Sequence, residues 1–383
     1  MPNMSLDDFM EVPEPPAATK LADRFEYPVG YNFAFVGVGQ GGGRIANTFA
    51  SLGYSRVAAV NTTIGDLSEL TDLPVTSKLD VGNARGAGKD PEAAAALIGD
   101  KRDVLFDLYK QSLGDDPDYV FICLAAAGGT GAGCFSTALE VAREYLASLK
   151  RDVKVGAIVA LPKDSEGQRY AINAVHTFKC LRNLGKISPL IFIDNEQFRL
   201  LFSATPATQE KAKSNVMTAQ LLHAFNRIAA LKSSDMGGAT FDRADFGKLL
   251  DSGIVAFAAH KITNWSSPAD FAAPIRDRLK QNCLASIDLS HGSVAGLLYG
   301  LAGRAYDEVT VAHTDYGVEA MTRLMCNAGK PTTVFTGMYP LDGADIVSVM
   351  AMIGDLPWPT GRVEALAKVA GLQKNELAEF LRV

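Results

Sequence analysis

Two glycine-rich segments of the sequence have the residue types that surround phosphate groups in proteins. The first covers residues 37–43 and the second covers residues 125–133, and each follows an apolar run and precedes a helical pattern. Glycine lets backbone amides approach a phosphate, and the N-terminus of the following helix favours negative charge. Two such loops on neighbouring strands predict a polyphosphate ligand, because each loop surrounds only part of it. The predicted phosphate-binding residues are Gly39, Gln40, Gly41, Gly42, Gly128, Gly129, Thr130, Gly131, Ala132 and Gly133.

Other phosphate-binding motifs fit the sequence less well. Gly37, Gly39 and Gly42 match the dinucleotide fingerprint, but Asn61 stands where that fingerprint has an acidic residue at the end of the second strand. A dehydrogenase also needs only one glycine-rich loop. The pattern GxxxxGK[ST] does not occur in the sequence, which excludes a P-loop. An NAD-dependent oxidoreductase is therefore the disfavoured alternative.

Asp242 and Asp245 are the candidate catalytic residues. Their spacing of three allows both carboxylates to lie on one side of a turn that enters a helix, where their charge suits the helix N-terminus. Carboxylates in such a place can orient and polarise a water molecule for attack on a γ-phosphate. Simple capping of the helix is the alternative interpretation.

The elements that would position these residues alternate along the first half of the chain. Apolar runs at 33–39, 56–61, 119–125, 154–161 and 190–194 have the length and continuous hydrophobicity of parallel strands buried on both faces. Helical patterns separate them. This alternation predicts a Rossmann-like, doubly wound α/β domain.

The rhythm changes after a long helical pattern at 210–233. The segments VAGLLYGLAG, EVTVAHTD, TTVFTG and SVMAMIG predict strands, and 269–285 and 315–329 predict helices, which together indicate a smaller α+β domain. We expect the following division: a flexible N-terminal arm at 1–30, a nucleotide-binding domain at 31–209, a central helix at 210–238, a catalytic loop with its following segment at 239–268, the α+β domain at 269–358, and a helical tail at 359–383.

Composition narrows the class of protein. The 383 residues include 37 basic and 43 acidic ones, and the net charge of −6 disfavours direct binding of nucleic acid. Five scattered cysteines without CxxC spacing indicate a reducing compartment. No apolar stretch reaches the roughly 20 residues of a membrane span, and the acidic, proline-containing N-terminus does not resemble a signal peptide. We expect a cytoplasmic protein.

Several motifs, in this order along the chain, resemble those of the tubulin/FtsZ superfamily. The sequence GGTGAG at 128–133 resembles the family's signature loop, GGGTGTG, and residues 39–42 resemble the first loop of tubulin. Residues 86–92 are similar to the third phosphate loop of FtsZ. The segments 164–169, 193–196 and 239–245 resemble the ribose-contacting segment, the following strand end and the synergy loop.

The resemblance implies a protein that binds GTP and Mg²⁺, polymerises head to tail, and hydrolyses GTP where Asp242 and Asp245 meet the nucleotide of the next subunit. It implies no direct metal ligand: the ion is held through phosphates and water, with Gln40 near a bound water. The further nucleotide-binding residues that it implies are Arg44, Asn61, Gly86, Ala87, Gly88, Glu166, Arg169, Asn195 and Asn215. A surface ion pair is the alternative for Glu166 and Arg169, a solvated position on the helix face is the alternative for Arg44, and a loop cap is the alternative for Asn195.

The sequence also departs from the family pattern. Ala127 and Ala132 replace a glycine and a threonine of the signature loop, and Thr240 replaces the asparagine of the synergy loop. Together with the Gln40 loop, these departures resemble a divergent, TubZ-like branch that positions or segregates plasmid or phage DNA, with a DNA-bound adaptor or the plasmid or phage cargo as partner and no direct contact with nucleic acid. Division or shape control, and a tubulin-fold assembly protein that does not hydrolyse GTP, are the alternatives.

Overall fold

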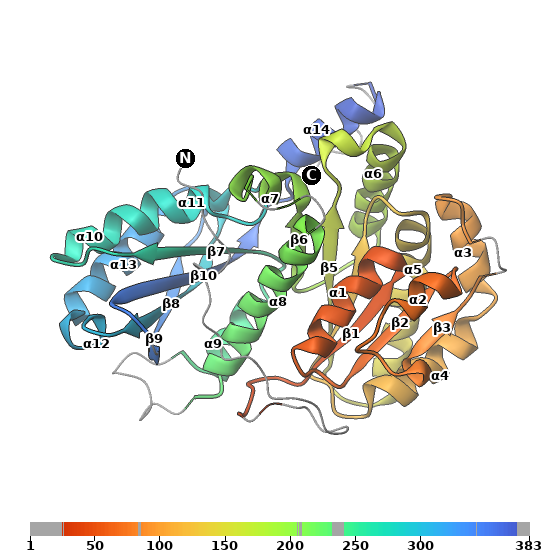
Figure 1. Cartoon of the computed structure of the whole chain (residues 1–383), viewed down its shortest axis with the longest axis horizontal. Helices are drawn as coiled ribbons and strands as arrows, with labels where there is room; N and C mark the ends of the chain where they lie inside the picture. Colours follow the sequence, from red (N-terminus) through yellow and green to blue (C-terminus); the bar gives the residue numbers. More distant parts are fainter. Residues whose placement is uncertain are drawn as a thin grey trace.

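The computed structural model describes residues 25, 27–82, 86–204, 206, 209–231, 241–341 and 343–373 (Figure 1). Within these ranges ten strands form one sheet, in the order β3-β2-β1-β4-β5-β6-β7-β10-β8-β9. The strands are β1 (Phe33–Val38), β2 (Val57–Asn61), β3 (Lys78–Asp80), β4 (Tyr119–Ala125), β5 (Lys154–Leu161), β6 (Leu190–Asp194), β7 (Ile254–Ile262), β8 (Val294–Ala302), β9 (Thr333–Leu341) and β10 (Ile346–Leu356). Neighbouring strands from β3 to β7 are parallel, and β10 is antiparallel to β7 and β8. The predicted doubly wound α/β fold is confirmed.

The continuous apolar strands follow from burial of both faces of the sheet. In β1, Phe33 and Phe35 pack into the hydrophobic cluster on one face, whereas Ala34, Val36 and Val38 pack into the cluster on the other. Each face therefore requires apolar side chains at alternate positions, and together they leave no polar position within the strand.

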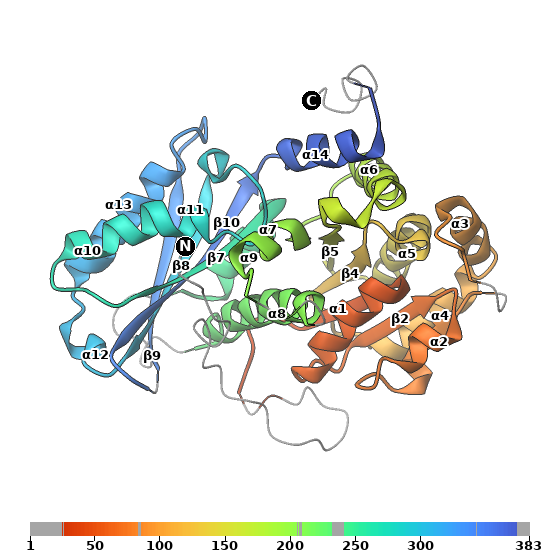
Figure 2. The same cartoon turned by 45° about the horizontal axis from the view of Figure 1, so that its top comes forward.

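Helices cover both faces (Figures 1 and 2). The face of Phe33 is covered by α1 (Gly39–Ser51), α2 (Ile64–Ser68), α7 (Asn195–Leu201), α8 (Glu210–Ile228) and α9 (Arg243–Leu250). The face of Val36 is covered by α3 (Pro91–Gly99), α4 (Arg102–Leu113), α5 (Gly129–Ser148), α6 (Gln168–Asn183), α10 (Pro268–Ala273), α11 (Leu279–Gln281), α12 (Ala305–Glu308), α13 (Val311–Leu324) and α14 (Thr360–Ala370).

The predicted central helix is α8, which lies alongside α1 (Figure 2). It contains 19 residues, so it is about 28 Å long. Its first turns lie near the carboxyl end of β6, and its far end packs against α9. The predicted end at residue 238 lies outside the described residues. The helix therefore extends from the carboxyl end of β6 to α9.

One predicted strand is wrong. The segment EVTVAHTD forms the end of α12 and the start of α13 instead. The ring of His313 bonds the N-cap residue Thr310, with 2.9 Å between Nδ1 and Oγ1, and its Nε2 lies 3.0 Å from the carbonyl oxygen of Trp265. This capping interaction and burial outweigh the strand preference of the valines and threonines.

The two ends of the chain lie largely outside the described residues. The predicted arm at 1–30 is described only at Phe25 and residues 27–30, and the predicted tail at 359–383 is described as far as residue 373, with α14 ending at Ala370. Among the described helices, none is both long and apolar enough to cross a bilayer.

A buried polar cluster fastens the chain before β1 to α8. The side chain of Asn226 accepts a hydrogen bond from the amide of Tyr31 at 2.8 Å and donates one to its carbonyl at 2.9 Å. Beside it, Nδ1 of His223 lies 3.1 Å from the hydroxyl of Tyr54, and the ring of Phe25 packs against the imidazole at a tilt of 33°. Burial, with a smaller contribution from Arg227, lowers the pKa of His223 from 6.5 to about 4.

This cluster predicts a loss of stability in mild acid. Above pH 6.5 His223 is neutral in both the folded and the unfolded protein, so its low pKa does not reduce the free energy of unfolding. As the pH falls from 6.5 to 4, the unfolded chain takes up a proton that the folded protein rejects, and the free energy of unfolding falls by about 3 kcal/mol. Chemical denaturation across this range should show a shallower pH slope for His223→Phe, which keeps a ring against Phe25. Equal slopes would contradict the prediction.

Candidate functional site

A cavity of about 370 Å³ opens at the carboxyl ends of β1, β2, β4, β5 and β6. This edge includes the point at which the strand order reverses, between β1 and β4, and open α/β sheets bind ligands at such a point. Of the predicted residues, those that line the cavity are Gln40, Gly41, Arg44, Asn61, Gly86, Ala87, Gly88, Gly128, Gly129, Thr130, Gly131, Glu166, Asn195 and Asn215. Gly39, Gly42, Ala132, Gly133 and Arg169 do not line it.

Two helices begin at this cavity. Gly39 is the first residue of α1 and Gly128 is the N-cap residue of α5, so both helices present their first-turn amides to the same space. The positive ends of the two helix dipoles therefore converge there. A ligand with several negative charges along its length matches this arrangement.

Two of the predicted phosphate-binding glycines have a packing role. A Cβ on Gly42 would lie 2.0 Å from the carbonyl oxygen of Cys123, and one on Gly133 would lie 2.0 Å from that of Pro91. Gly42 thus allows α1 to pack on β4, and Gly133 allows α5 to pack against the start of α3. Both glycines therefore allow the close packing around the cavity without lining it.

The loop at residues 86–92, which the sequence analysis compared with the third phosphate loop of FtsZ, is held by two side chains of α6. The guanidinium of Arg169 donates to the carbonyl of Lys89 at 3.1 Å, and Nδ2 of Asn173 donates to the same carbonyl at 3.2 Å and to that of Ala127 at 3.1 Å. Arg169 thus contacts the loop and does not itself line the cavity. Lys89, which the sequence analysis missed, lines the cavity with its ammonium group over the ring of Tyr170.

An aspartate that the sequence analysis also missed joins the first loop to the end of β2. The carboxylate of Asp66 accepts from Nε2 of Gln40 and from Nδ2 of Asn61, both at 3.0 Å. Nearby, the hydroxyls of Thr62 and Thr130 lie 2.7 Å apart. All of these side chains line the cavity next to the two helix N-termini. A sequence signal existed in TTIGD, which directly follows the strand, but it resembles an ordinary helix start.

The opposite wall offers the side-chain carboxamides of two asparagines. Asn195 follows β6, and its Oδ1 accepts from the hydroxyl of Ser214 at 3.1 Å, while Asn215 reaches the cavity from α8. Glu166 pairs with Lys211 at 3.0 Å. Each carboxamide has both donors and an acceptor, which suits the edge of a nucleobase. One end of the cavity is therefore chemically suited to phosphate groups, and the other end is suited to a nucleoside.

At the mouth, Arg44 pairs with Glu69 at 2.8 Å, and both side chains are about half exposed. A surface ion pair of this kind contributes little to stability. Arg44 thus lies in the cavity wall with about half of its side chain exposed to solvent.

Asp242 and Asp245 do not belong to this cavity. Asp242 is the exposed N-cap residue of α9, and its Oδ1 accepts from the amide of Asp245 at 2.9 Å; Asp245 in turn lies 3.4 Å from the ammonium group of Lys248. These residues lie at the far end of α8 from Lys211 and Asn215. Residues 239 and 240 of the predicted loop lie outside the described residues. One subunit alone therefore keeps the acids away from the cavity.

Comparison with known proteins gives the relationship of the chain. A family model described as "Tubulin like" matches residues 92–314. CetZ of Pyrococcus abyssi is 33% identical over 169 residues, which are 43% of this chain and 44% of CetZ. The chain thus spans about half the length of the first curated relatives that it matches.

Solved structures match over a larger share of the chain. CetZ2 of Haloferax volcanii, in a GTPγS-bound protofilament, has a TM-score of 0.70 at 19% identity and covers 91% of this chain and 99% of its own. TubZ of Bacillus thuringiensis serovar israelensis, in a GTPγS-form protofilament, has a TM-score of 0.74 at 18% identity and covers 92% and 94%. These similarities confirm the predicted tubulin/FtsZ-type fold.

Proposed function

The chain belongs to the tubulin-like family, and from this premise we propose that it binds GTP, assembles head to tail, and hydrolyses GTP at the contact between two subunits. The observation that carries the proposal is the separation between the cavity and the acidic pair Asp242 and Asp245. The cavity lies at the first turns of α8, a helix about 28 Å long, and Asp242 and Asp245 lie beyond the far end of that helix. A head-to-tail contact would bring the acids of one subunit to the cavity of the next.

Such a contact joins two different surfaces of identical subunits, so it repeats without closing and generates a filament. The GTPγS-bound CetZ2 and the GTPγS-form TubZ are themselves protofilaments, which supports this reading of the geometry. Asp242 is exposed in the single subunit, as a group that completes a neighbouring site must be.

We assign the ends of the cavity to the two ends of GTP. The N-termini of α1 and α5 would bind the phosphates, and Asn195 and Asn215 would bind the guanine base. Asp242 and Asp245 would orient the attacking water, while the amides stabilise the charge that develops on the phosphate oxygens.

The phosphate end also fits a hydrated magnesium ion. Gln40 and Asp66 contribute an amide oxygen and a carboxylate there, and Mg²⁺ keeps several waters while binding one or two carboxylates and substrate phosphates. The ion would neutralise charge on the phosphate oxygens. Both residues would hold it through water.

The test is GTP turnover per subunit over a series of protein concentrations, with light scattering recorded in parallel. A site shared between subunits predicts negligible turnover below a critical concentration and a steep rise above it, together with the scattering. Turnover that is independent of concentration would contradict the shared site. Nucleotide-dependent scattering without turnover would instead assign a non-hydrolysing assembly protein.

We further propose a cytoplasmic filament whose cargo is plasmid or phage DNA, held through an adaptor. The support is the similarity in fold to a TubZ of type III plasmid segregation, which has a TM-score of 0.70 and covers 93% of this chain. Deletion of the gene should then cause loss of the DNA element from dividing cells. A change of cell shape or division without such loss would assign the filament to shape or division control.

A further inference from the structure

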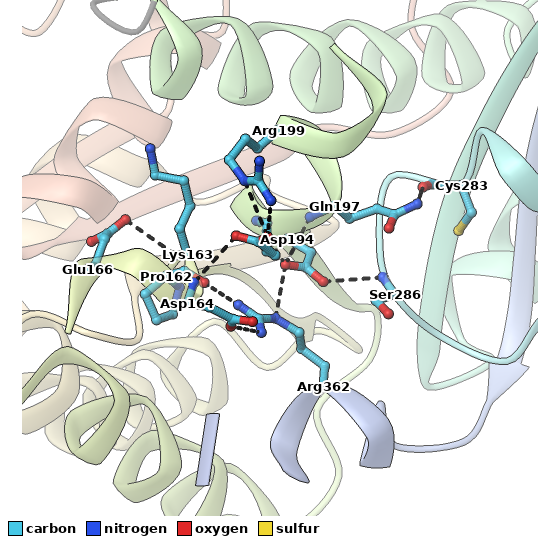
Figure 3. Close-up of polar contacts among 11 residues, drawn as sticks. Pro162, Lys163, Asp164, Glu166, Asp194, Gln197, Arg199, Cys283, Ser286 and Arg362 are labelled. Carbon is cyan, nitrogen blue, oxygen red and sulfur yellow. Dashed lines mark hydrogen bonds and ion pairs between the residues drawn. The ribbon is translucent and has the colours of Figure 1, made fainter. Parts of the chain in front are cut away.

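A buried arginine connects the C-terminal helix to the nucleoside end of the cavity. Arg362, near the start of α14, has only 4% of its side chain exposed. Its Nε lies 3.1 Å from Oδ1 of Asp194, one terminal nitrogen contacts the carboxylate of Asp164, and the other donates to the carbonyl oxygen of Pro162 (Figure 3). Each nitrogen of the guanidinium thus contacts a different residue.

These partners adjoin residues that line the cavity. Pro162 is itself part of the wall, and Asp164 begins the short turn η3 (Asp164–Glu166) that ends at Glu166, another wall residue. Asp194 directly precedes Asn195, the carboxamide proposed to contact the base. One side chain from α14 therefore braces two separate wall segments from behind.

Asp194, the carboxylate that Nε of Arg362 contacts, is fully buried. Asp194 has 1% of its side chain exposed and caps α7 by accepting from the amides of Glu196 and Gln197 at 3.1 and 3.4 Å. Its other oxygen accepts from the amide of Ser286 at 3.3 Å (Figure 3). Burial raises the pKa of Asp194, while Arg362 and these amides oppose the shift. The segment after α11 is thereby tied to the same point.

We propose that Arg362 is a positioning residue for the nucleoside end of the cavity. It holds the 162–166 segment and Asn195 at the separation that the ribose and base of the nucleotide require, whereas the phosphate end is held by α1 and α5 without it. This inference rests on the proposed binding of GTP. A core ion pair that only stabilises the fold is the competing explanation, since breaking a buried charge pair is costly.

The two explanations differ in which part of the nucleotide loses affinity. Asp164→Ala removes one contact of the brace but leaves Arg362 with Asp194 and Pro162, and the Asp164 side chain is 45% exposed, so the fold should tolerate the change. Arg362→Lys is the second variant, because it keeps a positive charge beside Asp194 while a single ammonium group cannot reproduce the three-pronged contact. The matched control is Asp345→Ala, which removes a 40% exposed partner of Arg304 outside the cavity.

Each protein is titrated with GTP and with inorganic tripolyphosphate, and its thermal unfolding is recorded. We expect both brace variants to bind GTP about tenfold more weakly, which is the effect on affinity of losing one charge-assisted contact. Both should bind tripolyphosphate as the unmodified protein does. The control should bind both ligands unchanged.

Equal weakening of both ligands, or unchanged GTP affinity in a folded Asp164→Ala protein, would overturn the positioning role. An unmodified protein that binds neither ligand would overturn the proposed GTP binding as well, so the two failures can be told apart.

Discussion

Asp242→Asn should abolish GTP turnover while GTP binding and assembly persist. Asparagine is as good an N-cap residue as aspartate, so α9 keeps its capping bond to the amide of Asp245. The negative charge that would orient and polarise the water is lost, which should lower turnover by at least about 100-fold. An assay of phosphate release, by radiolabelled GTP or a coupled enzyme, measures turnover. Light scattering from the same sample measures assembly.

Complementation gives this prediction its sharpest form. Asp242→Asn subunits keep an intact cavity, so they should regain turnover when mixed with subunits that have intact acids but a blocked cavity. Such a mixture contains one productive type of contact, and neither protein is active alone. A mixture that stays inactive, or an Asp242→Asn protein with near-normal turnover, would show that Asp242 does not complete a neighbouring site.

The blocked cavity is the second large effect. Gly128→Asp should abolish nucleotide binding and at the same time stabilise the protein. Gly128 is the N-cap residue of α5, and a Cβ there would meet only the Ala125 carbonyl oxygen at 3.7 Å and the Gly131 amide at 3.9 Å, so an aspartate fits without strain. Its carboxylate would cap α5, which should raise the free energy of unfolding by a few tenths of a kcal/mol, because glycine is already a tolerated N-cap residue.

The same carboxylate would occupy the amides intended for phosphate. Like charges brought together cost several kcal/mol, so GTP affinity should fall by more than about 100-fold. Calorimetric titration with GTP and thermal unfolding measure the two effects. Gly99→Asp is the charge-matched control, because a Cβ on Gly99 meets nothing within 4 Å and the residue lies outside the cavity. Tight GTP binding by Gly128→Asp would contradict the assignment of the phosphate end.

Local patterns were sufficient for eight of the ten described strands, all except β3 and β7, and for the two glycine-rich loops. Strands such as β1 and β4 are apolar at every position because both faces are covered, and glycines are concentrated where a helix begins against a strand. Both requirements act between near neighbours in the chain, so they leave a readable pattern. The segment EVTVAHTD was misread because its outcome depends on His313 reaching Trp265, a contact across 48 positions.

The sequence by itself determined the class of fold, the two glycine-rich helix N-termini, and the presence of an acidic pair at the start of a helix. Only the tertiary structure decided which glycines line the cavity, that Arg169 holds a loop, and that Asp66 joins Gln40 to Asn61. It also placed Arg362 behind a wall formed about 170 and 200 positions earlier. Burial and hydrogen bonding between distant segments depend on how helices pack on the sheet, and no local spacing of residue types records that packing.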